Sequence, residues 1–319
     1  MKNDVSRRER RAGFSAVALL AVLFVGGIFW AARSVGATAQ SGEPSARAAV
    51  KDQDQTIVAA GDIVDCTHLA DSEATAKLLD SIPGTILALG DLAYPDGSDD
   101  NFRCYDKTWG RHKARTRPAP GNHEYHTPGA AGYLKYFGNG VGSPGHAYYS
   151  FNLGDWHIIS LDSQCKDAGG CQKGSPEEVW LRNDLAKNAS NCILAFWHVP
   201  LFSSGRAHGN ALEMKPFWDD LYAARADVVL NGHDHDYERF TPQNPDGLAD
   251  KEHGIREFVV GAGGKSKRGF NAPSPTSEVR DSSTFGVLQM TLRAHNYEWK
   301  FIPVAGGQFS DTGTGNCHK

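Results

Sequence analysis

The sequence predicts an α/β protein in which mixed β-sheets are covered by helices. Short runs of β-branched and aliphatic residues recur along the chain, and the first of them end in Gly61-Asp62, Gly90-Asp91 and Gly121-Asn122. Strand and helix patterns alternate early, whereas closely spaced strands dominate late. Hydrophobic residues make up 40% and charged residues 22% of the 319 residues, which excludes a disordered or fibrous chain. The 35 glycines and 15 prolines indicate many tight loops rather than a helical bundle.

The individual elements follow from these local patterns. Strands are expected at residues 56–60, 85–89, 116–120, 147–152, 156–161, 192–197, 226–230, 257–260, 285–292 and 297–304. Apolar side chains at helical spacing predict helices over residues 71–79, 129–137, 176–187 and 211–224. We find no internal repeat, and we therefore expect one domain over residues 55–305, with a polar linker at 40–54 before it and a C-terminal tail at 306–319.

Residues 1–39 have the composition of a membrane-targeting segment. Nineteen consecutive uncharged residues, 14–32, follow four arginines, and positive charge on that side directs the following chain out of the cytoplasm. Ala37-Thr38-Ala39 is a cleavage pattern and favours a removed signal peptide, whereas the length of the apolar run favours an uncleaved anchor. We expect a secreted or periplasmic protein, or one anchored through residues 14–32 and facing outside.

The charge of the chain is unevenly distributed. Residues 1–39 carry six basic and two acidic side chains, which leaves 27 basic and 35 acidic ones in residues 40–319. Because contacts to phosphate backbones need clustered Lys and Arg, this acidic body argues against nucleic acid as the main partner.

Six cysteines suit an exported protein with up to three disulfides. Six cysteines allow fifteen connectivities, and some of them could instead be buried thiols. Cys165 and Cys171 flank a glycine-rich loop and form the expected local pair. For the others we predict Cys66–Cys104 and Cys192–Cys317, the second of which would tie down the C-terminal tail.

Polar side chains of metal-ligand type follow five of the predicted strands. In open α/β sheets, ligands bind at the carboxyl ends of the strands. A single Asp at such a position is typically a turn or helix cap, but five strand ends together favour a site. The candidates are Asp62, Asp91, Tyr94, Asn122, His123, His198, His233 and His235.

The residue types in this set fit a pair of metal ions. Carboxylates, an amide oxygen, imidazoles and a phenolate are ligands of hard and borderline metals. Asp91 could bridge two metals, because a carboxylate offers one oxygen to each. Two metals a few ångströms apart can activate a hydroxide and clamp the oxygens of a displacement at phosphorus.

The ordered motifs resemble the calcineurin-like metallophosphoesterases. They are Asp62, Gly90-Asp91-Leu92-Ala93-Tyr94, Gly121-Asn122-His123-Glu124, Trp197-His198 and Gly232-His233-Asp234-His235. Tyr94 and the extension Asp236-Tyr237-Glu238-Arg239 are similar to purple acid phosphatases in particular. The resemblance implies a four-layer α/β/β/α sandwich of two mixed sheets flanked by helices. The first motif departs from the family pattern, because Val64 stands where a glycine is usual, so we expect a different turn there.

The resemblance also implies the role of each candidate. An iron ion would be held by Asp62, Asp91, Tyr94 and His235, with the Tyr94 phenolate giving a visible colour. A second ion, iron, zinc or manganese, would be held by Asp91, Asn122, His198 and His233. His123 would contact phosphate or protonate the leaving group, and His208, whose spacing is looser, would be a second such histidine.

The predicted function is hydrolysis of small phosphomonoesters by a metal-bound hydroxide, without a phosphoenzyme intermediate. A phosphodiesterase or nucleotidase of the same superfamily is the alternative, and a non-catalytic metal-binding surface protein is a third possibility. The loops at residues 138–145 and 261–275 are expected to set the width of the substrate site.

Overall fold

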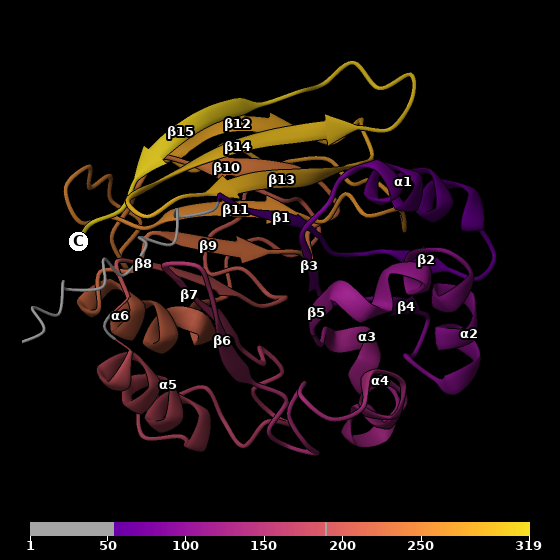
Figure 1. The fold of residues 1–319 in the computed structure, drawn as a ribbon, viewed down its shortest axis with the longest axis horizontal. Coiled ribbons are helices and arrows are strands. Elements are labelled where there is room, and N and C mark those ends of the chain that lie inside the picture. Colours follow the sequence, from indigo (N-terminus) through magenta and orange to yellow (C-terminus); the bar gives the residue numbers. More distant parts are fainter. Residues whose placement is uncertain (1–53, 189) are drawn as a thin grey trace, which may run out of the picture. The chain divides into compact units, whose positions relative to one another are not determined.

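Two β-sheets lie between two groups of helices (Figure 1). The computed structural model describes residues 54–188 and 190–319. Within these ranges, no helix combines the length and the apolar character needed to cross a membrane. The predicted targeting segment at residues 1–39, and the predicted linker up to residue 53, lie outside the described residues.

One sheet has six strands, in the order β15-β14-β13-β1-β3-β5, and the other has seven, in the order β12-β10-β11-β9-β8-β7-β6. The six-stranded sheet contains β1 (Gln55–Ala60), β3 (Thr85–Leu89), β5 (Thr116–Ala119), β13 (Gly286–Leu292), β14 (Asn296–Pro303) and β15 (Thr312–Asn316). The seven-stranded sheet contains β6 (Tyr149–Leu153), β7 (Trp156–Ser160), β8 (Cys192–Phe196), β9 (Val228–Asn231), β10 (Tyr237–Phe240), β11 (Arg256–Val260) and β12 (Ser277–Asp281). A short ladder joins β2 (Val64–Asp65) to β4 (Ala93–Tyr94).

Helices cover the outer faces of both sheets. The first group is α1 (Leu69–Ser81), α2 (Asp99–Lys107), α3 (Asn122–Tyr125) and α4 (Ala131–Phe137), and the second is α5 (Pro176–Lys187) and α6 (Lys215–Ala223) (Figure 1). Three 3₁₀ segments complete the described elements: Trp109–Arg115, Pro128–Ala130 and Leu212–Met214. Helix α5 begins where the sequence provides a cap, because the Ser175 side chain accepts the Glu178 amide and Pro176 occupies the first turn.

Strand β8 shows how the layers are held together. Successive side chains of a strand point to opposite faces of a sheet. Leu194 and Phe196 join the core between the sheets, whereas Ile193 and Ala195 join a second core with α5 and α6, to which Leu181, Phe217, Trp218 and Leu221 contribute. Because both faces are covered, all five β8 residues are buried, which is why the strand is a continuous apolar run in the sequence.

The predicted fold class is confirmed. All ten predicted strands and all four predicted helices overlap elements of the structure. Strands β10, β12 and β15 were not predicted, because the first contains the charged pair Glu238 and Arg239 and the other two are polar strands at sheet edges. The two-residue strands β2 and β4 and the helices α2 and α3 were not predicted either. Strand β15 lies within residues 306–319 and pairs with β14, so the predicted tail contributes a strand to the six-stranded sheet.

The three predicted disulfides are all present. Cys66 is bonded to Cys104, Cys165 to Cys171, and Cys192 to Cys317. The last bond joins the start of β8 to the end of the chain across 125 residues. Such cross-links persist in oxidising compartments, and they indicate an extracytoplasmic location.

The parallel strands bring the candidate residues to one edge. β1 pairs in parallel with β3, and β3 with β5, while β8 pairs in parallel with β9. Because parallel strands end at the same edge of a sheet, the segments after β1, β3 and β5 lie together, and so do those after β8 and β9. A hydrogen bond from the His233 amide to Asp62 joins the two sets.

Removing the Cys192–Cys317 bond should destabilise the protein more than removing Cys165–Cys171. Sequence separations of 125 and 6 residues correspond, by loop entropy, to losses of about 5 and about 2 kcal/mol in the free energy of unfolding. Denaturant unfolding of the two paired Cys→Ala variants measures both losses. Equal losses would show that loop entropy does not govern these bonds.

Candidate metal centre

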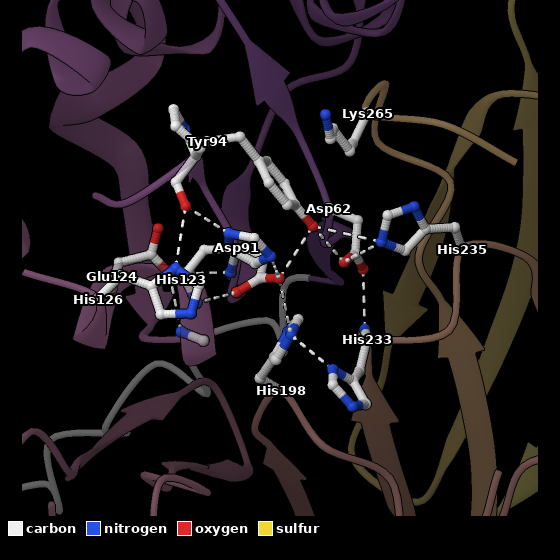
Figure 2. Close-up of polar contacts among 12 residues, drawn as sticks. Asp62, Asp91, Tyr94, His123, Glu124, His126, His198, His233, His235 and Lys265 are labelled. Carbon is white, nitrogen blue, oxygen red and sulfur yellow. Dashed lines mark hydrogen bonds and ion pairs between the residues drawn. The ribbon is translucent and has the colours of Figure 1, made fainter. Parts of the chain in front are cut away.

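Side chains from the ends of five strands converge on one point between the two sheets. Asp62 follows β1, Asp91 follows β3, His123 lies after β5, His198 follows β8, and His233 follows β9 (Figure 2). The ligand-bearing atoms of Asp62, Asp91 and His198 all lie within 4.8 Å of one another, and the three residues are buried. The structure therefore brings together residues that are up to 171 positions apart in the chain.

Three of these residues have backbone angles that side chains rarely adopt. The φ angles of Asp62, Asp91 and His233 are 59°, 51° and 72°, in the left-handed region. Each of the three follows a glycine, and Gly90 shows why: a Cβ atom there would lie 2.6 Å from the His198 ring. The close approach of His198 to the turn after β3 requires glycine at this position.

The hydroxyl of Tyr94 faces more acceptors than its single proton can serve. It lies 2.9 Å from Oδ1 of Asp62, 2.9 Å from Oδ2 of Asp91 and 3.3 Å from Nε2 of His235. A phenol donates one hydrogen bond, so the two carboxylate oxygens share one donor. This cluster of acceptors is the arrangement that a cation would satisfy.

The histidines are oriented by outer partners. Nδ1 of His198 donates to the carbonyl oxygen of Leu89 at 2.8 Å, because a carbonyl can only accept. Its Nε2 then faces Oδ2 of Asp91 at 3.3 Å. His235 is arranged in the same way, with Nδ1 2.6 Å from Oγ of Ser266 and Nε2 3.2 Å from Oδ1 of Asp62. Metal-ligating histidines are held by this kind of second hydrogen bond.

Burial and mutual charge displace the pKa values of these groups. Burial alone would raise the pKa of Asp62, but His235 and His198 outweigh it and hold the value below its usual range. Burial opposes protonation of His198, yet Asp91 raises its pKa to about 10. Burial and the neighbouring His198 lower the pKa of His233 to about 3. Nδ1 of His233 lies 3.2 Å from Nε2 of His198, so protonation of one ring disfavours protonation of the other.

Asn122 has a buried amide oxygen with no hydrogen-bond partner among the described residues. Buried polar atoms are almost always paired, so an orphaned oxygen needs an explanation. The next residue, His123, donates its backbone N–H to Oδ1 of Asp91 at 2.9 Å, which places Asn122 beside the carboxylate cluster. A free amide oxygen at this position fits a metal ligand.

The two predicted catalytic histidines contact different residues of this cluster. Nδ1 of His123 donates to the Pro95 carbonyl at 2.5 Å, and its Nε2 lies 3.8 Å from Oδ2 of Asp91. The ring of His208 stacks on that of His233, with centroids 3.9 Å apart. A third imidazole, that of His126, was not predicted, and its ring centroid lies 4.7 Å from that of His123.

Glu124 holds two of the ligand-bearing turns together, a role not predicted from the sequence. Its fully buried carboxylate accepts four backbone N–H groups, from Asp91, Leu92, Ala93 and Gly121, at 2.8–3.1 Å. Burial and the charge of Asp91 raise the pKa of Glu124 to about 8, although the amides of Gly121 and Ala93 act in the opposite direction by favouring the carboxylate. Its place three residues after Gly121, at the start of α3, is the position of a capping-box glutamate.

At Val64, where a different turn was expected, the chain forms a short β-ladder. The amides of Ile63 and Val64 donate to the carbonyls of Asp91 and Leu92 at 2.9 and 3.1 Å. Val64 and Asp65 then continue as β2, paired with β4. An extended β-branched residue fits this conformation, so the segment needs no glycine at position 64.

Comparisons with known proteins agree with this geometry. Residues 46–237 match the family model of calcineurin-like phosphoesterases. Purple acid phosphatase 15 of Arabidopsis thaliana is 30% identical over 205 residues, which cover 53% of this chain and 38% of that protein. Purple acid phosphatase 21 of the same plant is 29% identical over 259 residues, which cover 71% of this chain and 56% of that protein. The chain therefore spans less than half of the first relative's length and little more than half of the second's.

A solved structure shows the same fold. Purple acid phosphatase PPD1 from yellow lupin (Lupinus luteus) seeds superposes with a TM-score of 0.70 at 18% sequence identity. The superposition covers 83% of this chain and 54% of that one. It agrees with the two mixed sheets and flanking helices described above.

Replacing Glu124 by Gln should loosen the centre. The amide nitrogen cannot accept the two N–H groups, of Asp91 and Gly121, that now share Oε2. Two unsatisfied buried donors should cost on the order of 3 kcal/mol in the free energy of unfolding and lower the bound-metal content. Denaturant unfolding and elemental analysis measure both, with the exposed Glu213→Gln as the control. Wild-type stability in Glu124→Gln would rule out this role.

Proposed function

Because the chain belongs to the calcineurin-like phosphoesterase family, we propose that it is an exported phosphatase that hydrolyses phosphomonoesters with two metal ions. The observation that carries this proposal is the shared Tyr94 proton: Asp62, Asp91 and His235 all point at one hydroxyl. A ligand set with that excess of acceptors is suited to a metal ion rather than to a network of hydrogen bonds alone.

The residues divide into two ligand groups that share Asp91. Iron would be held by Asp62, Asp91, Tyr94 and His235, and the second ion, iron, zinc or manganese, by Asp91, Asn122, His198 and His233. The free amide oxygen of Asn122 and the imidazole nitrogens of His198 and His233, 3.2 Å apart, support the second group. When bound, the metals would supply the nucleophile and neutralise charge on the phosphoryl oxygens.

His123 has the geometry of a proton donor to the leaving group. Because the Pro95 carbonyl fixes the proton on Nδ1, the ring keeps one orientation and turns Nε2 toward Asp91. The side chain is 25% exposed, so it lies at the boundary between the buried carboxylates and solvent. A proton carried on Nε2 could pass to the departing oxygen there. His208, stacked on His233, is the second proposed contact for phosphate.

The proposed export rests on two features of the chain. The first is the basic and then apolar composition of residues 1–39, which suits a cleaved signal peptide or an outward-facing anchor. The second is that all six cysteines are oxidised, with no free thiol among the described residues. Secretion, periplasmic location and anchoring are distinguished by fractionating cells that express the full chain.

Asp91→Ala should remove phosphatase activity. Both ligand groups lose a member at once, so kcat/KM for an aryl phosphate should fall by at least about 1,000-fold, since a metal pair contributes several kcal/mol. The assay compares metal-loaded wild type, Asp91→Ala and the surface control Asp219→Ala, whose side chain pairs with Lys215 on α6. Equal activity in all three would refute the assignment. Wild-type activity restricted to phosphodiesters would replace the proposal with the phosphodiesterase alternative.

Tyr94→Phe should abolish the visible absorption band while some hydrolysis remains. The colour would come from the phenolate bound to iron, whereas the carboxylates of Asp62 and Asp91 remain in the variant. Absorption spectra of the iron-loaded proteins measure this, with Tyr136→Phe as the control because that phenol bonds Asp106 instead. An unchanged band would remove Tyr94 from the iron site.

A further inference from the structure

The loop between β11 and β12 is basic in an otherwise acidic body. Residues 261–276 contain three basic side chains and no acidic one. Two of the three have partners of their own. The ammonium of Lys265 pairs with Asp65 and lies 4.9 Å from the centroid of the Tyr94 ring, and Nζ of Lys267 donates to the Ser283 carbonyl at 2.6 Å.

Arg268, the third basic residue, is directed toward the metal centre. Its Nη1 lies 2.8 Å from Nε2 of His208, whose ring stacks on His233. Among the described residues, no carboxylate lies within the 4.0 Å of an ion pair with its guanidinium. A guanidinium without a counter-ion, one side chain away from a proposed metal ligand, is placed to bind an anion.

A second guanidinium lies against the same loop. Nη2 of Arg206 is 3.4 Å from the position that a Cβ atom would take on Gly269. Arg206 likewise forms no ion pair with a described residue, and its side chain is exposed. Two uncompensated cations on adjoining loops raise the local positive potential, which a bound anion would neutralise.

Hydrogen bonds hold these loops in place. The Arg268 amide donates to the His235 carbonyl at 3.0 Å, and the Arg206 amide donates to the Gly269 carbonyl at 2.9 Å. The fully buried carboxylate of Asp234 accepts hydrogen bonds from the Ser203 hydroxyl at 2.5 Å and from the His208 amide at 3.3 Å. The main chain that carries both arginines is thus fixed before any substrate arrives, which lowers the entropy cost of binding.

We propose that Arg268, supported by Arg206, is a specificity residue for substrates that carry a second phosphate next to the one transferred. This inference rests on the proposed phosphatase function. The substrate class is the phosphoanhydrides, such as pyrophosphate and nucleoside diphosphates. The planar fork of arginine matches two phosphate oxygens at once. In the reaction, water adds to the terminal phosphorus and the bridging oxygen leaves with the inner phosphate. One water proton stays on the released phosphate and the other passes to solvent.

The test measures binding, so that it does not depend on turnover. Calorimetry of the metal-loaded full chain compares methylenediphosphonate, which cannot be hydrolysed, with methylphosphonate, which has a single phosphoryl group. We expect the wild type to bind the diphosphonate at least about tenfold more tightly, and Arg268→Gln to lose most of that ratio. Arg268→Lys, which keeps the charge without the fork, should retain part of it. Lys267→Gln, in the same loop, should keep the wild-type ratio because its ammonium is held by Ser283.

The outcomes separate the two proposals. An Arg268→Gln variant that weakens both phosphonates equally would make Arg268 a positioning residue for His208 and overturn the inference. A wild type that does not prefer the diphosphonate would also overturn it. If the preference is present and depends on Arg268, but no phosphoester is hydrolysed, the inference holds and the proposed phosphatase function fails.

Discussion

The carboxylate of Glu124 joins the two turns on which the metal centre is built. Its Oε2 accepts the amides of both Asp91 and Gly121, so the turn after β3 and the turn after β5 meet at one atom. Asp91 in turn accepts the amide of His123, which closes the connection from the other side. Asp91 and Asn122 are therefore placed by main-chain hydrogen bonds, independently of any metal. Since the group is fully buried, no water can replace these bonds.

The centre also connects the two sheets, and this compensates for its unfavourable backbone geometry. Side chains in sparsely populated backbone regions cost about 1–3 kcal/mol each, and Asp62, Asp91 and His233 all have positive φ. Asp62 at the end of β1 accepts the amide of His233 at 2.8 Å, although the two follow strands of different sheets. His198 similarly donates to Leu89 across the interface. The candidate ligand residues thus contribute to holding the sheets together, and strain at one of them is offset by a hydrogen bond to another.

The sequence predicts local features of this protein better than contacts between distant residues. Apolar runs such as β8 and the Gly-Asp pairs at strand ends are local, so the sheets and the candidate ligands could be identified. Strand β10 was not predicted because it contains charged residues, whose partners come from other parts of the chain. The Arg239 side chain, for example, donates to Asp311, 72 residues away. The capping-box position of Glu124 is a local pattern, but its bonds to the turn after β3 and the contact of Arg268 with His208 join distant residues that no local pattern reveals.

The position of Tyr94 illustrates how cross-linking and chemistry are related in this chain. The β2–β4 ladder that carries Tyr94 contains only two residue pairs, and so short a ladder is not stable alone. The disulfide of Cys66, the residue after β2, ties this segment to Cys104 on α2, and the Lys265–Asp65 ion pair ties it to the basic loop. The Cys66–Cys104 bond therefore supports the segment that aligns the phenol with Asp62 and Asp91, and an oxidising compartment preserves that bond.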